Sequence, residues 1–162
     1  MGTEKKIVSL ATLKRKVRQL KKEGRTVGFT NGCFDLLHQG HVRYLEKAAG
    51  AVDTLILGLN SDRSVRAIKG KSRPIVGQDG RSRVMAALEA VDFVVLFDED
   101  TPYRLIAALR PDVLFKGSDW KAEEVVGADI VTAGGGKVKL IDYVPNNSST
   151  NIIAAVLKKC RT

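Results

Sequence analysis

Apolar runs of strand length alternate with helical segments along almost the whole chain. The runs predicted as strands are RTVGFT, DTLILGLN, FVVLF and DVLFKG, at residues 25–30, 53–60, 93–97 and 112–117. The segments predicted as helices lie between or after these runs and cover residues 41–50, 81–92, 101–110 and 148–160. The second run is apolar at nearly every position, which is typical of a strand buried on both faces of a sheet. This alternation predicts βαβ units and an α/β fold with a doubly wound parallel sheet.

Two further segments complete the predicted fold. Residues 128–144 surround the glycines at 134–136, and we expect one strand piece on each side of that turn. Near the N-terminus, four apolar residues recur at helical spacing, namely Leu10, Leu13, Val17 and Leu20. We therefore expect a single domain over residues 1–162. Its core spans about residues 25–158, and a basic amphipathic helix within residues 1–24 packs on it.

The positive charge of the chain is concentrated at its N-terminus. The formal net charge is +9, and residues 1–25 carry nine Lys or Arg against two Glu. A basic chain suggests nucleic-acid binding as one class of function. The N-terminal helix has no aromatic side chain, however, and the rest of the chain is nearly balanced in charge. We therefore expect no nucleic-acid partner and a solvated basic face that can attract anionic substrates.

The sequence gives no sign of secretion or membrane insertion. No apolar run approaches the roughly 20 residues that span a bilayer. The first 16 residues lack the apolar stretch and cleavage site of a signal peptide. Cys33 and Cys160 are far apart and form no CxxC pair, which fits two reduced thiols. We expect a cytoplasmic protein with no membrane partner.

Four polar or glycine-rich segments follow the predicted strands. They are TNGCFDLLHQGH, NSDRSVRAIKGKSRP, KGSDW and NNSSTN, which begin at residues 30, 60, 116 and 146. Doubly wound sheets bind ligands at the carboxyl ends of their strands, near the point where the strand order reverses. The four segments are therefore expected to meet in one site.

The familiar nucleotide and metal motifs are absent from these segments. Gly70, Lys71 and Ser72 mimic the end of a phosphate-binding GK[ST] loop, but Val65 stands where its first glycine belongs. No GxGxxG follows the first predicted strand, and no spacing matches a zinc site. Cys33 with the two histidines could form a nucleophilic pair, but the chain offers it no supporting context.

The remaining signal is H-x-G-H between a predicted strand and a predicted helix, with His38 and His41 as the only histidines of the chain. Helix N-termini attract anions through their free N–H groups and dipole. Histidines in the first turn add donors, and Gly40 lets a phosphate approach the backbone closely. Such a constellation can stabilise a phosphoryl group in transfer without a covalent intermediate.

The sequence GCFDLLHQGHVRYL resembles the HxGH nucleotidyltransferases, a superfamily of small cytidylyl- and adenylyltransferases. The resemblance covers about residues 25–158. The blocks LNSDRSVRAIKGKSRP, ALEAVDFVVLF, DEDTPYRLI, KGSDW and SSTNII are similar, in order and spacing, to the branch that adenylylates D-glycero-β-D-manno-heptose 1-phosphate. The family fold is a Rossmann-like α/β sheet. The family is often fused to a sugar kinase, and this chain resembles the stand-alone form.

The resemblance implies a reaction in which ATP and heptose 1-phosphate give ADP-heptose and pyrophosphate, in lipopolysaccharide or related glycan precursor synthesis. The sugar phosphate would attack the α-phosphorus in line. Mg²⁺ is expected as a partner of the triphosphate, because the sequence shows no carboxylate cage for it. The resemblance also implies a homo-oligomer, a dimer or larger.

The resemblance assigns roles to individual residues. The residues expected to be catalytic are His38, His41 and Lys69. The residues expected to bind the nucleotide are Thr30, Asn31, Gly32, Phe34, Gly40, Arg81, Lys116, Gly117, Asp119, Ser149 and Thr150. The residues expected to bind the sugar phosphate are Asp35, Asn60, Asp62, Lys71 and Arg73, with Asp35 facing either the sugar or Mg²⁺. Trp120 either stacks on a ligand or packs. The VGQDG sequence before Arg81 is richer in glycine than the family pattern.

Two alternatives stay open at this point. One is a cytidylyltransferase of the same fold that uses CTP with glycerol 3-phosphate or another alcohol phosphate. Asn151-Ile152-Ile153 after the last serine–threonine motif favours the heptose branch, because the cytidylyl branch often has a basic residue there. The other alternative, from a different class, is a nucleotide-binding module without catalytic activity.

Overall fold

Structure is described for residues 2–142 and 148–160 of the chain, from a computed structural model. Its centre is a five-stranded sheet in which every neighbouring pair of strands is parallel. The strands lie in the order β3-β2-β1-β4-β5. Their bounds are Val27–Gly32 (β1), Thr54–Asn60 (β2), Phe93–Phe97 (β3), Val113–Gly117 (β4) and Lys137–Ile141 (β5). The predicted Rossmann-like, doubly wound parallel sheet is confirmed, in a single domain.

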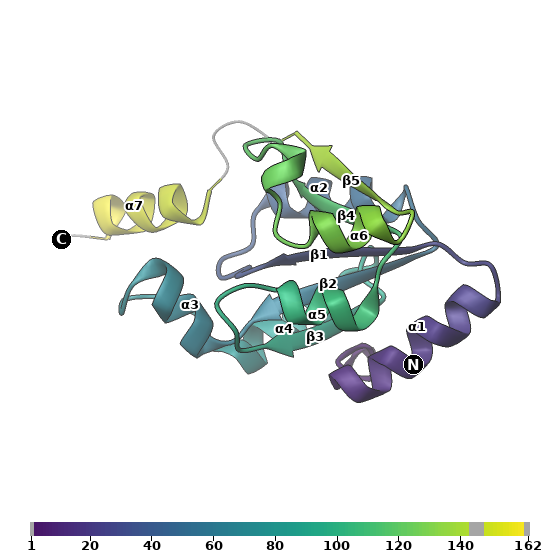
Figure 1. Ribbon diagram of the computed structural model, residues 1–162. Helices are drawn as coiled ribbons and strands as arrows, with labels where there is room; N and C mark the ends of the chain where they lie inside the picture. Colours follow the sequence, from purple (N-terminus) through teal and green to yellow (C-terminus); the bar gives the residue numbers. More distant parts are fainter. Residues whose placement is uncertain (1, 143–147, 161–162) are drawn as a thin grey trace.

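Helices cover both faces of the sheet (Figure 1). On one face lie α1 (Leu10–Lys22), α5 (Tyr103–Leu109) and α6 (Ala128–Ala133), whose apolar side chains form one core cluster with the sheet. On the other face α2 (Gln39–Ala49) and α4 (Gln78–Ala87) form a second cluster. Alternate residues of β2 enter the two clusters, Ile56 the first and Leu57 the second. The near-continuous apolar sequence of β2 thus reflects burial on both faces.

The N-terminal segment closes one edge of the sheet. After a short 3-10 helix (Thr3–Lys6), Ile7 forms a parallel bridge with Val94 of the edge strand β3. Helix α1 then begins after Ser9, whose hydroxyl caps it. Its Leu13 is fully buried. The amphipathic helix predicted in this region therefore exists and packs on the sheet.

The prediction of two strand pieces in residues 128–144 is wrong for the first piece. Residues Ala128–Ala133 form the short helix α6 instead, and Ala128 and Val131, three positions apart, are buried against the sheet. Gly127, at φ 89°, turns the chain into this helix. The second piece is a strand, β5, which ends at Ile141, and residues 143–144 lie outside the described residues.

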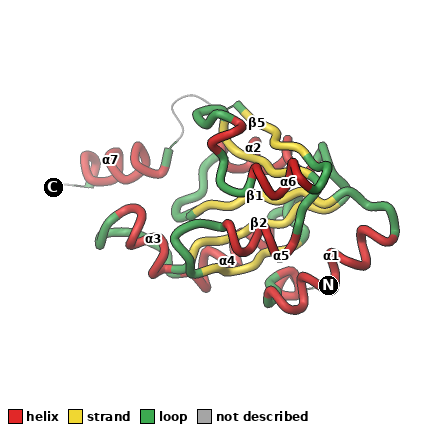
Figure 2. The backbone as a smooth tube through the Cα atoms, in the orientation of Figure 1, coloured by secondary structure: helices red, strands yellow, loops and turns green. Residues whose placement is uncertain are grey.

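Two helices lie beyond the carboxyl ends of the strands. Helix α3 (Asp62–Lys69), which was not among the predicted elements, follows β2, and α7 (Ser149–Lys159) is the last helix. Figures 1 and 2 show both on the same side of the sheet, at the left of the view. A further 3-10 turn covers Ala122–Glu124. In the described part of the chain, no helix has the length and apolar character needed to cross a membrane.

Candidate active site

A cavity of about 280 Å³ opens where the strand order reverses, between the carboxyl ends of β1 and β4. We call it the first cavity. Residues from β1, α2, α3, β4 and α7 line it, together with the loops that join them. They are Asn31, Gly32, Cys33, Phe34, His38, Gly40, His41, Tyr44, Lys69, Arg73, Gly117, Ser148, Ser149 and Thr150. Polar segments that lie far apart in the sequence therefore meet at one site; Asn146 and Asn147 of the fourth segment lie outside the described residues.

A second cavity, of about 440 Å³, adjoins the first. The two share a wall made of Gly32, Cys33, Phe34, His41, Lys69, Arg73 and Ser149. The second cavity adds Asp35, Ile68, Asp100, Thr101, Pro102, Lys116, Trp120 and Val126. Two molecules that occupied these cavities would meet at the shared wall, beside a histidine and two cationic side chains.

The two histidines stack on each other at the start of α2. Their ring centroids are 3.8 Å apart, and the Phe34 ring lies 5.1 Å from that of His41. Burial, with smaller effects from the charges of His38 and Lys69, lowers the pKa of His41 to about 4. Burial also lowers the pKa of His38. Both imidazoles are therefore neutral near pH 7, and each can donate one N–H to an anion.

The N-termini of α2 and α7 face the first cavity. His38 is the N-cap residue of α2, but its side chain makes no capping hydrogen bond, and Gly40 in the first turn lines the cavity. At α7 the Ser148 hydroxyl caps the helix, and the Ser149 hydroxyl donates to the carbonyl of Leu36 at 2.9 Å. Free N–H groups and the positive ends of two helix dipoles suit a polyanion such as a triphosphate.

Three cationic side chains surround the second cavity. Lys69 ends α3 and lines both cavities, as does Arg73 in the loop that follows. Lys116 projects from β4, and its Nζ donates to Oδ1 of Asn31 at 2.9 Å. Burial lowers the pKa of the Lys116 ammonium group. Lys69 and Arg73 therefore make the shared wall positive, and Lys116 adds positive charge on the side of the second cavity.

Cys33 lies in the shared wall, but its environment does not favour a thiolate. Burial raises the pKa of its thiol, despite the opposing charges of Lys69, Arg81 and Arg73. A thiol nucleophile requires the opposite shift. The geometry therefore gives no support to the Cys–His nucleophilic pair that the sequence left open.

Asp35 is buried, and its carboxylate is occupied by donors from the chain. Oδ2 accepts from Nε of Arg73 at 2.6 Å, and the backbone N–H groups of Ile75 and Val76 donate to the carboxylate at 2.9 Å. Burial by itself would raise the pKa of Asp35, but these donors together hold it below its ordinary value. The carboxylate is thus ionised and already satisfied, unlike one that awaits a sugar or a metal ion.

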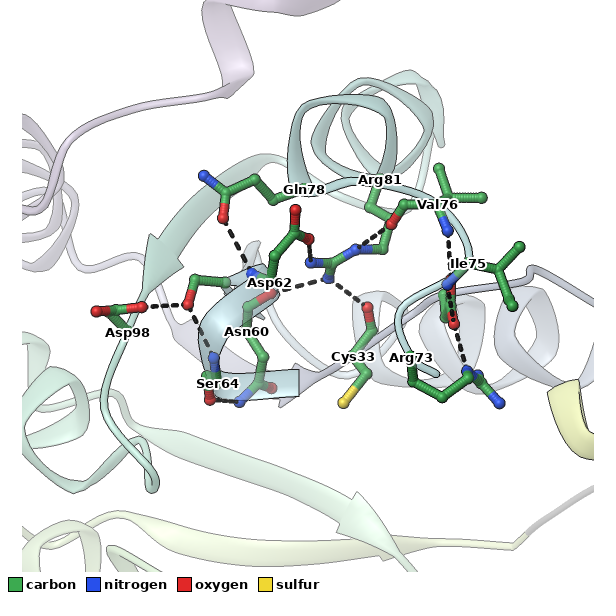
Figure 3. Close-up of polar contacts among 12 residues, drawn as sticks. Cys33, Asn60, Asp62, Ser64, Arg73, Ile75, Val76, Gln78, Arg81 and Asp98 are labelled. Atoms are coloured by element: carbon green, nitrogen blue, oxygen red, sulfur yellow. Dashed lines mark hydrogen bonds and ion pairs between the residues drawn. The ribbon is translucent and has the colours of Figure 1, made fainter. Parts of the chain in front are cut away.

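Arg81 lies behind the cavities rather than in their lining. Its residue is 1% exposed, and its guanidinium donates to the carbonyls of Val76, Cys33 and Asn60 and to the carboxylate of Asp62 (Figure 3). Its side chain is 0% exposed, so in this position it does not face a phosphate in either cavity. The sequence analysis did not predict that Arg81 binds backbone carbonyls, because no local pattern shows which carbonyls a buried guanidinium contacts.

Several other residues with expected roles also lie outside both linings. They are Thr30, Asn60, Asp62, Lys71 and Asp119. Thr30 is buried and shares a 2.9 Å hydrogen bond with the hydroxyl of Tyr44, and Asn60 donates to Ser64. Lys71 and Asp119 are exposed.

The structure adds residues that the sequence analysis did not single out. Tyr44 lines the first cavity, and Asp100 and Thr101 line the second. Tyr44 stands three residues after His41, which is the helical spacing that could have indicated it. The Asp100–Thr101 pair follows strand β3, so the rule of strand carboxyl ends would also have found it. Trp120 lines the second cavity and is 42% exposed, so its ring is available for stacking.

No cluster of three or more His, Cys, Asp or Glu side chains that could hold a metal ion is found among the described residues. Among the residues that the structure describes, the acidic ones that line either cavity are Asp35, already occupied, and Asp100. A divalent cation such as Mg²⁺ needs several oxygen ligands. The described side chains alone therefore do not fit a resident magnesium site.

A sequence profile described as cytidylyltransferase-like matches residues 29–155. The bifunctional protein HldE of Methylobacillus flagellatus is 56% identical to this chain over 148 residues, which are 91% of this chain and 30% of that protein. HldE of Geobacter sulfurreducens is 51% identical over 153 residues, or 94% and 31% of the two chains. The chain thus spans about a third of the length of these curated relatives.

Solved structures show the same architecture. A lipopolysaccharide core biosynthesis protein from Thermoplasma volcanium superposes with a TM-score of 0.62 and 27% identity, over 76% of this chain and 100% of that one. The pantoate-beta-alanine ligase of Francisella tularensis, solved with a form of ATP and beta-alanine, gives a TM-score of 0.60 at 16% identity. It covers 94% of this chain and 78% of the ligase, and at that identity the similarity concerns the fold alone.

Proposed function

Because the chain belongs to the cytidylyltransferase-like family, we propose that it transfers the adenylyl group of ATP to D-glycero-β-D-manno-heptose 1-phosphate. The products are ADP-heptose and pyrophosphate. The observation that carries the proposal is the pair of cavities that share a wall containing His41, Lys69 and Arg73. A transferase needs two anionic substrates to meet at one phosphorus atom, and the shared wall provides such a meeting point.

The first cavity suits the nucleotide. Two helix N-termini and the donors of His38 and His41 gather around it, which matches the charge of a triphosphate. The second cavity suits the sugar phosphate. Lys116 and the shared cations can hold its phosphate, while Asp100 and Thr101 offer hydrogen bonds to hydroxyl groups and Trp120 offers a stacking face.

The proposed chemical step is an in-line displacement. An oxygen of the sugar phosphate forms a bond to the α-phosphorus of ATP, and the bond from that phosphorus to the bridging oxygen of the β-phosphate breaks. Pyrophosphate leaves with the electron pair. The attacking phosphate is already an anion, so no general base has to remove a proton. The contribution of the protein is to position the two anions and to stabilise the charge on the transferred group.

Neutral histidines are suited to this task. An imidazole that donates an N–H to a phosphoryl oxygen does not have to lose a proton during the reaction. The anion also favours the charged form of the ring, so bound nucleotide raises the pKa of both histidines from their lowered values. Magnesium enters as part of the MgATP substrate, which offsets the charge of the triphosphate.

The choice of substrates rests on the sequence blocks that resemble the heptose adenylyltransferase branch and on the relatives at 51–56% identity. ADP-heptose would serve the synthesis of lipopolysaccharide or a related glycan, and the similar structure from Thermoplasma volcanium is that of a lipopolysaccharide core biosynthesis protein. The reaction would take place where ATP is available, in the cytoplasm. The homo-oligomer implied by the family resemblance is part of the same proposal.

The test is Mg²⁺-dependent pyrophosphate release with the β-heptose 1-phosphate, offering ATP and CTP in separate reactions. Release with ATP and not with CTP supports the proposal, and release with CTP alone overturns the choice of nucleotide. A folded protein that binds ATP but releases no pyrophosphate with either nucleotide would point to the binding module or to another acceptor.

Two matched variants connect this activity with the geometry. Lys69→Ala removes a cation from the shared wall, whereas Lys71→Ala removes an exposed one two positions later that lines neither cavity. We expect Lys69→Ala to lower kcat by about 10²-fold or more and Lys71→Ala to have at least tenfold less effect. His41→Ala should cost about 10²–10³-fold. Equal losses for the two lysine variants would contradict this assignment.

A further inference from the structure

The last residue of α3 and the loop that joins α3 to α4 carry the cations of the shared wall. We call residues 69–76 the basic loop; it contains Lys69, Lys71 and Arg73. Lys69 and Arg73 line both cavities, so the position of this loop decides where two of the positive charges stand. Ile75 and Lys71 are exposed, so burial of the loop's own side chains does little to fix it.

Asp35 holds the basic loop from one side. Its carboxylate accepts hydrogen bonds from Nε of Arg73 and from the backbone N–H groups of Ile75 and Val76, at 2.6–2.9 Å. The Asp35 side chain is 1% exposed and that of Arg73 13%. Because Asp35 lies three residues after the end of β1 and before the start of α2, these bonds fasten the basic loop to the segment that joins the two elements.

Arg81 holds the same loop from the other side. Its Nε donates to the carbonyl of Val76 at 2.9 Å, so the backbone of Val76 is bound at its N–H by Asp35 and at its C=O by Arg81. One terminal nitrogen donates to the carbonyls of Cys33 and Asn60 at 2.7 and 2.8 Å. The other donates to Asp62 at 2.8 Å, and Figure 3 shows the guanidinium at the centre of these partners.

The two side chains also hold Phe34, which lies between their anchor points. Arg81 binds the carbonyl of Cys33, and Asp35 is the next residue after Phe34. Phe34 has a φ of 43°, a left-handed conformation that a residue other than glycine adopts only when its surroundings fix it. Its ring lies against His41. The same pair of residues therefore fixes the aromatic support of a histidine.

We propose that Asp35 and Arg81 form one clamp that sets the position of the basic loop relative to His41. Both are positioning residues: they act through Lys69, Arg73 and Phe34 and do not touch the substrates. This inference rests on the proposed function and deepens it, because it explains how two cations and a histidine on separate segments are kept at one wall. It also gives Asp35 a role other than contact with sugar or Mg²⁺.

Conservative variants can separate a clamp from a substrate contact. Asp35→Asn keeps the shape of the side chain but places an NH₂ group opposite backbone N–H groups or the Arg73 guanidinium. Because an NH₂ group cannot accept a hydrogen bond, at least one of the bonds to the basic loop is lost. Arg81→Lys keeps the charge, but a single ammonium group cannot reach partners on four segments. The matched controls are Arg83→Lys and Asp79→Asn. Arg83 lies in the same helix as Arg81, and its exposed side chain pairs with Glu4 of the N-terminal 3-10 helix. Asp79, also in α4, is exposed.

The first measurement is hydrogen–deuterium exchange of the 162-residue chain without ligands. In Asp35→Asn and Arg81→Lys we expect the amides of residues 70–78 to exchange about tenfold faster or more, because each variant loses at least one buried hydrogen bond. The control variants should leave this segment unchanged. Thermal unfolding of each variant checks that it is folded, and if Arg81→Lys does not fold, Asp35→Asn decides the matter.

The second measurement is steady-state kinetics of pyrophosphate release with each substrate varied in turn. We expect both clamp variants to lose about 10²-fold in kcat, the order of loss that follows when catalytic groups shift by about an ångström. The Mg²⁺ concentration that gives half-maximal rate should not change. Faster exchange together with lost kcat supports the clamp.

Other outcomes overturn it. Lost activity with unchanged exchange would mean that Asp35 and Arg81 contact substrate, and a changed Mg²⁺ requirement in Asp35→Asn would make that residue a metal ligand. Faster exchange with unchanged kinetics would mean that fastening the loop is irrelevant to the reaction. If the unaltered protein transfers nothing to heptose 1-phosphate, the proposed function fails, whereas the exchange comparison still decides whether these residues hold the loop.

Discussion

At the level of single residues, the two histidines share an environment that favours their neutral forms. Their rings stack at 3.8 Å, and the buried Nδ1 atoms of both have no hydrogen-bond partner among the described residues. Such a pair is costly without a ligand, because each uncompensated buried polar atom loses its hydration. An anion that accepts hydrogen bonds from the rings offsets part of that cost.

This environment makes the stability of the protein depend on pH. The folded-state pKa of His41 is about 4, lowered first by burial, whereas an unfolded histidine titrates near 6.5. Between these values the unfolded chain binds more protons, so the free energy of unfolding falls as the pH decreases from about 6.5 to 4. The loss due to His41 is at most about 3 kcal/mol at pH 4 and disappears as the pH rises well above 6.5.

Urea denaturation across this range, compared with His41→Asn, isolates the effect. The carboxylates of the chain titrate in both proteins, so the difference between the two profiles belongs to His41. We expect the unaltered protein to lose stability more steeply than the variant as the pH falls. Parallel profiles would show that His41 is not held neutral by the fold.

At the level of elements, the helices divide into those that build the core and those that serve the site. Helix α1 packs Leu13 and Val17 into the first core cluster, so its basic face is the outer side of a structural helix. Helix α7 has no buried residue, and its N-terminus contributes three residues to the first cavity. Helix α1 therefore contributes to the core, whereas α7 contributes the donors of its N-terminus to the first cavity.

The contrast predicts unequal effects of two similar substitutions. Leu13→Ala removes a fully buried side chain of α1 and should lower the free energy of unfolding by about 2–4 kcal/mol. Leu157→Ala in α7 removes a side chain that is 55% exposed and should change it by less than about 0.5 kcal/mol. Denaturant unfolding of both variants checks this, and a comparable loss in Leu157→Ala would show that α7 is packed in solution.

At the level of the whole molecule, the doubly wound sheet creates the site. Connections run outward from β1 to β2 and β3 in one direction and to β4 and β5 in the other. The loops at the reversal diverge and leave a crevice, which here holds both cavities. The net charge of +9 adds a long-range attraction for anionic substrates that salt will weaken.

Nucleotide binding at this crevice should stabilise the entire fold. MgATP at about 100 times its Kd adds about 2.7 kcal/mol to the free energy of unfolding, which for a chain of this size raises Tm by about 5–10 °C. Differential scanning fluorimetry measures the shift, with MgCTP as the comparison. A chain that shows no shift with MgATP, at concentrations where it turns over substrate, would place the nucleotide outside the folded crevice.

Much of this architecture was accessible from the sequence. Apolar runs such as residues 53–60 predicted the buried parallel strands, because burial on both faces leaves little room for polar residues. The HxGH segment between a strand and a helix predicted that the start of α2 would lie at the site, and His38, Gly40 and His41 do line the first cavity. Residues 128–133 were misjudged because Ala128 and Val131, in a short segment, fit a strand as well as a helix until the sheet is present to cover them.

Only the tertiary structure decided which basic residues line the cavities and which are exposed or buried elsewhere. The sequence analysis expected Lys69, Lys71, Arg73 and Arg81 all to contact the substrates. In the structure, however, Lys69 and Arg73 line the cavities, Lys71 is exposed, and Arg81 is buried against backbone carbonyls. The local sequence pattern determines which helices and strands form and which of their ends lie at the site. Where a long charged side chain finds its partners depends on segments distant in the sequence, such as the carbonyls of Cys33 and Asn60, that only folding brings within hydrogen-bonding distance.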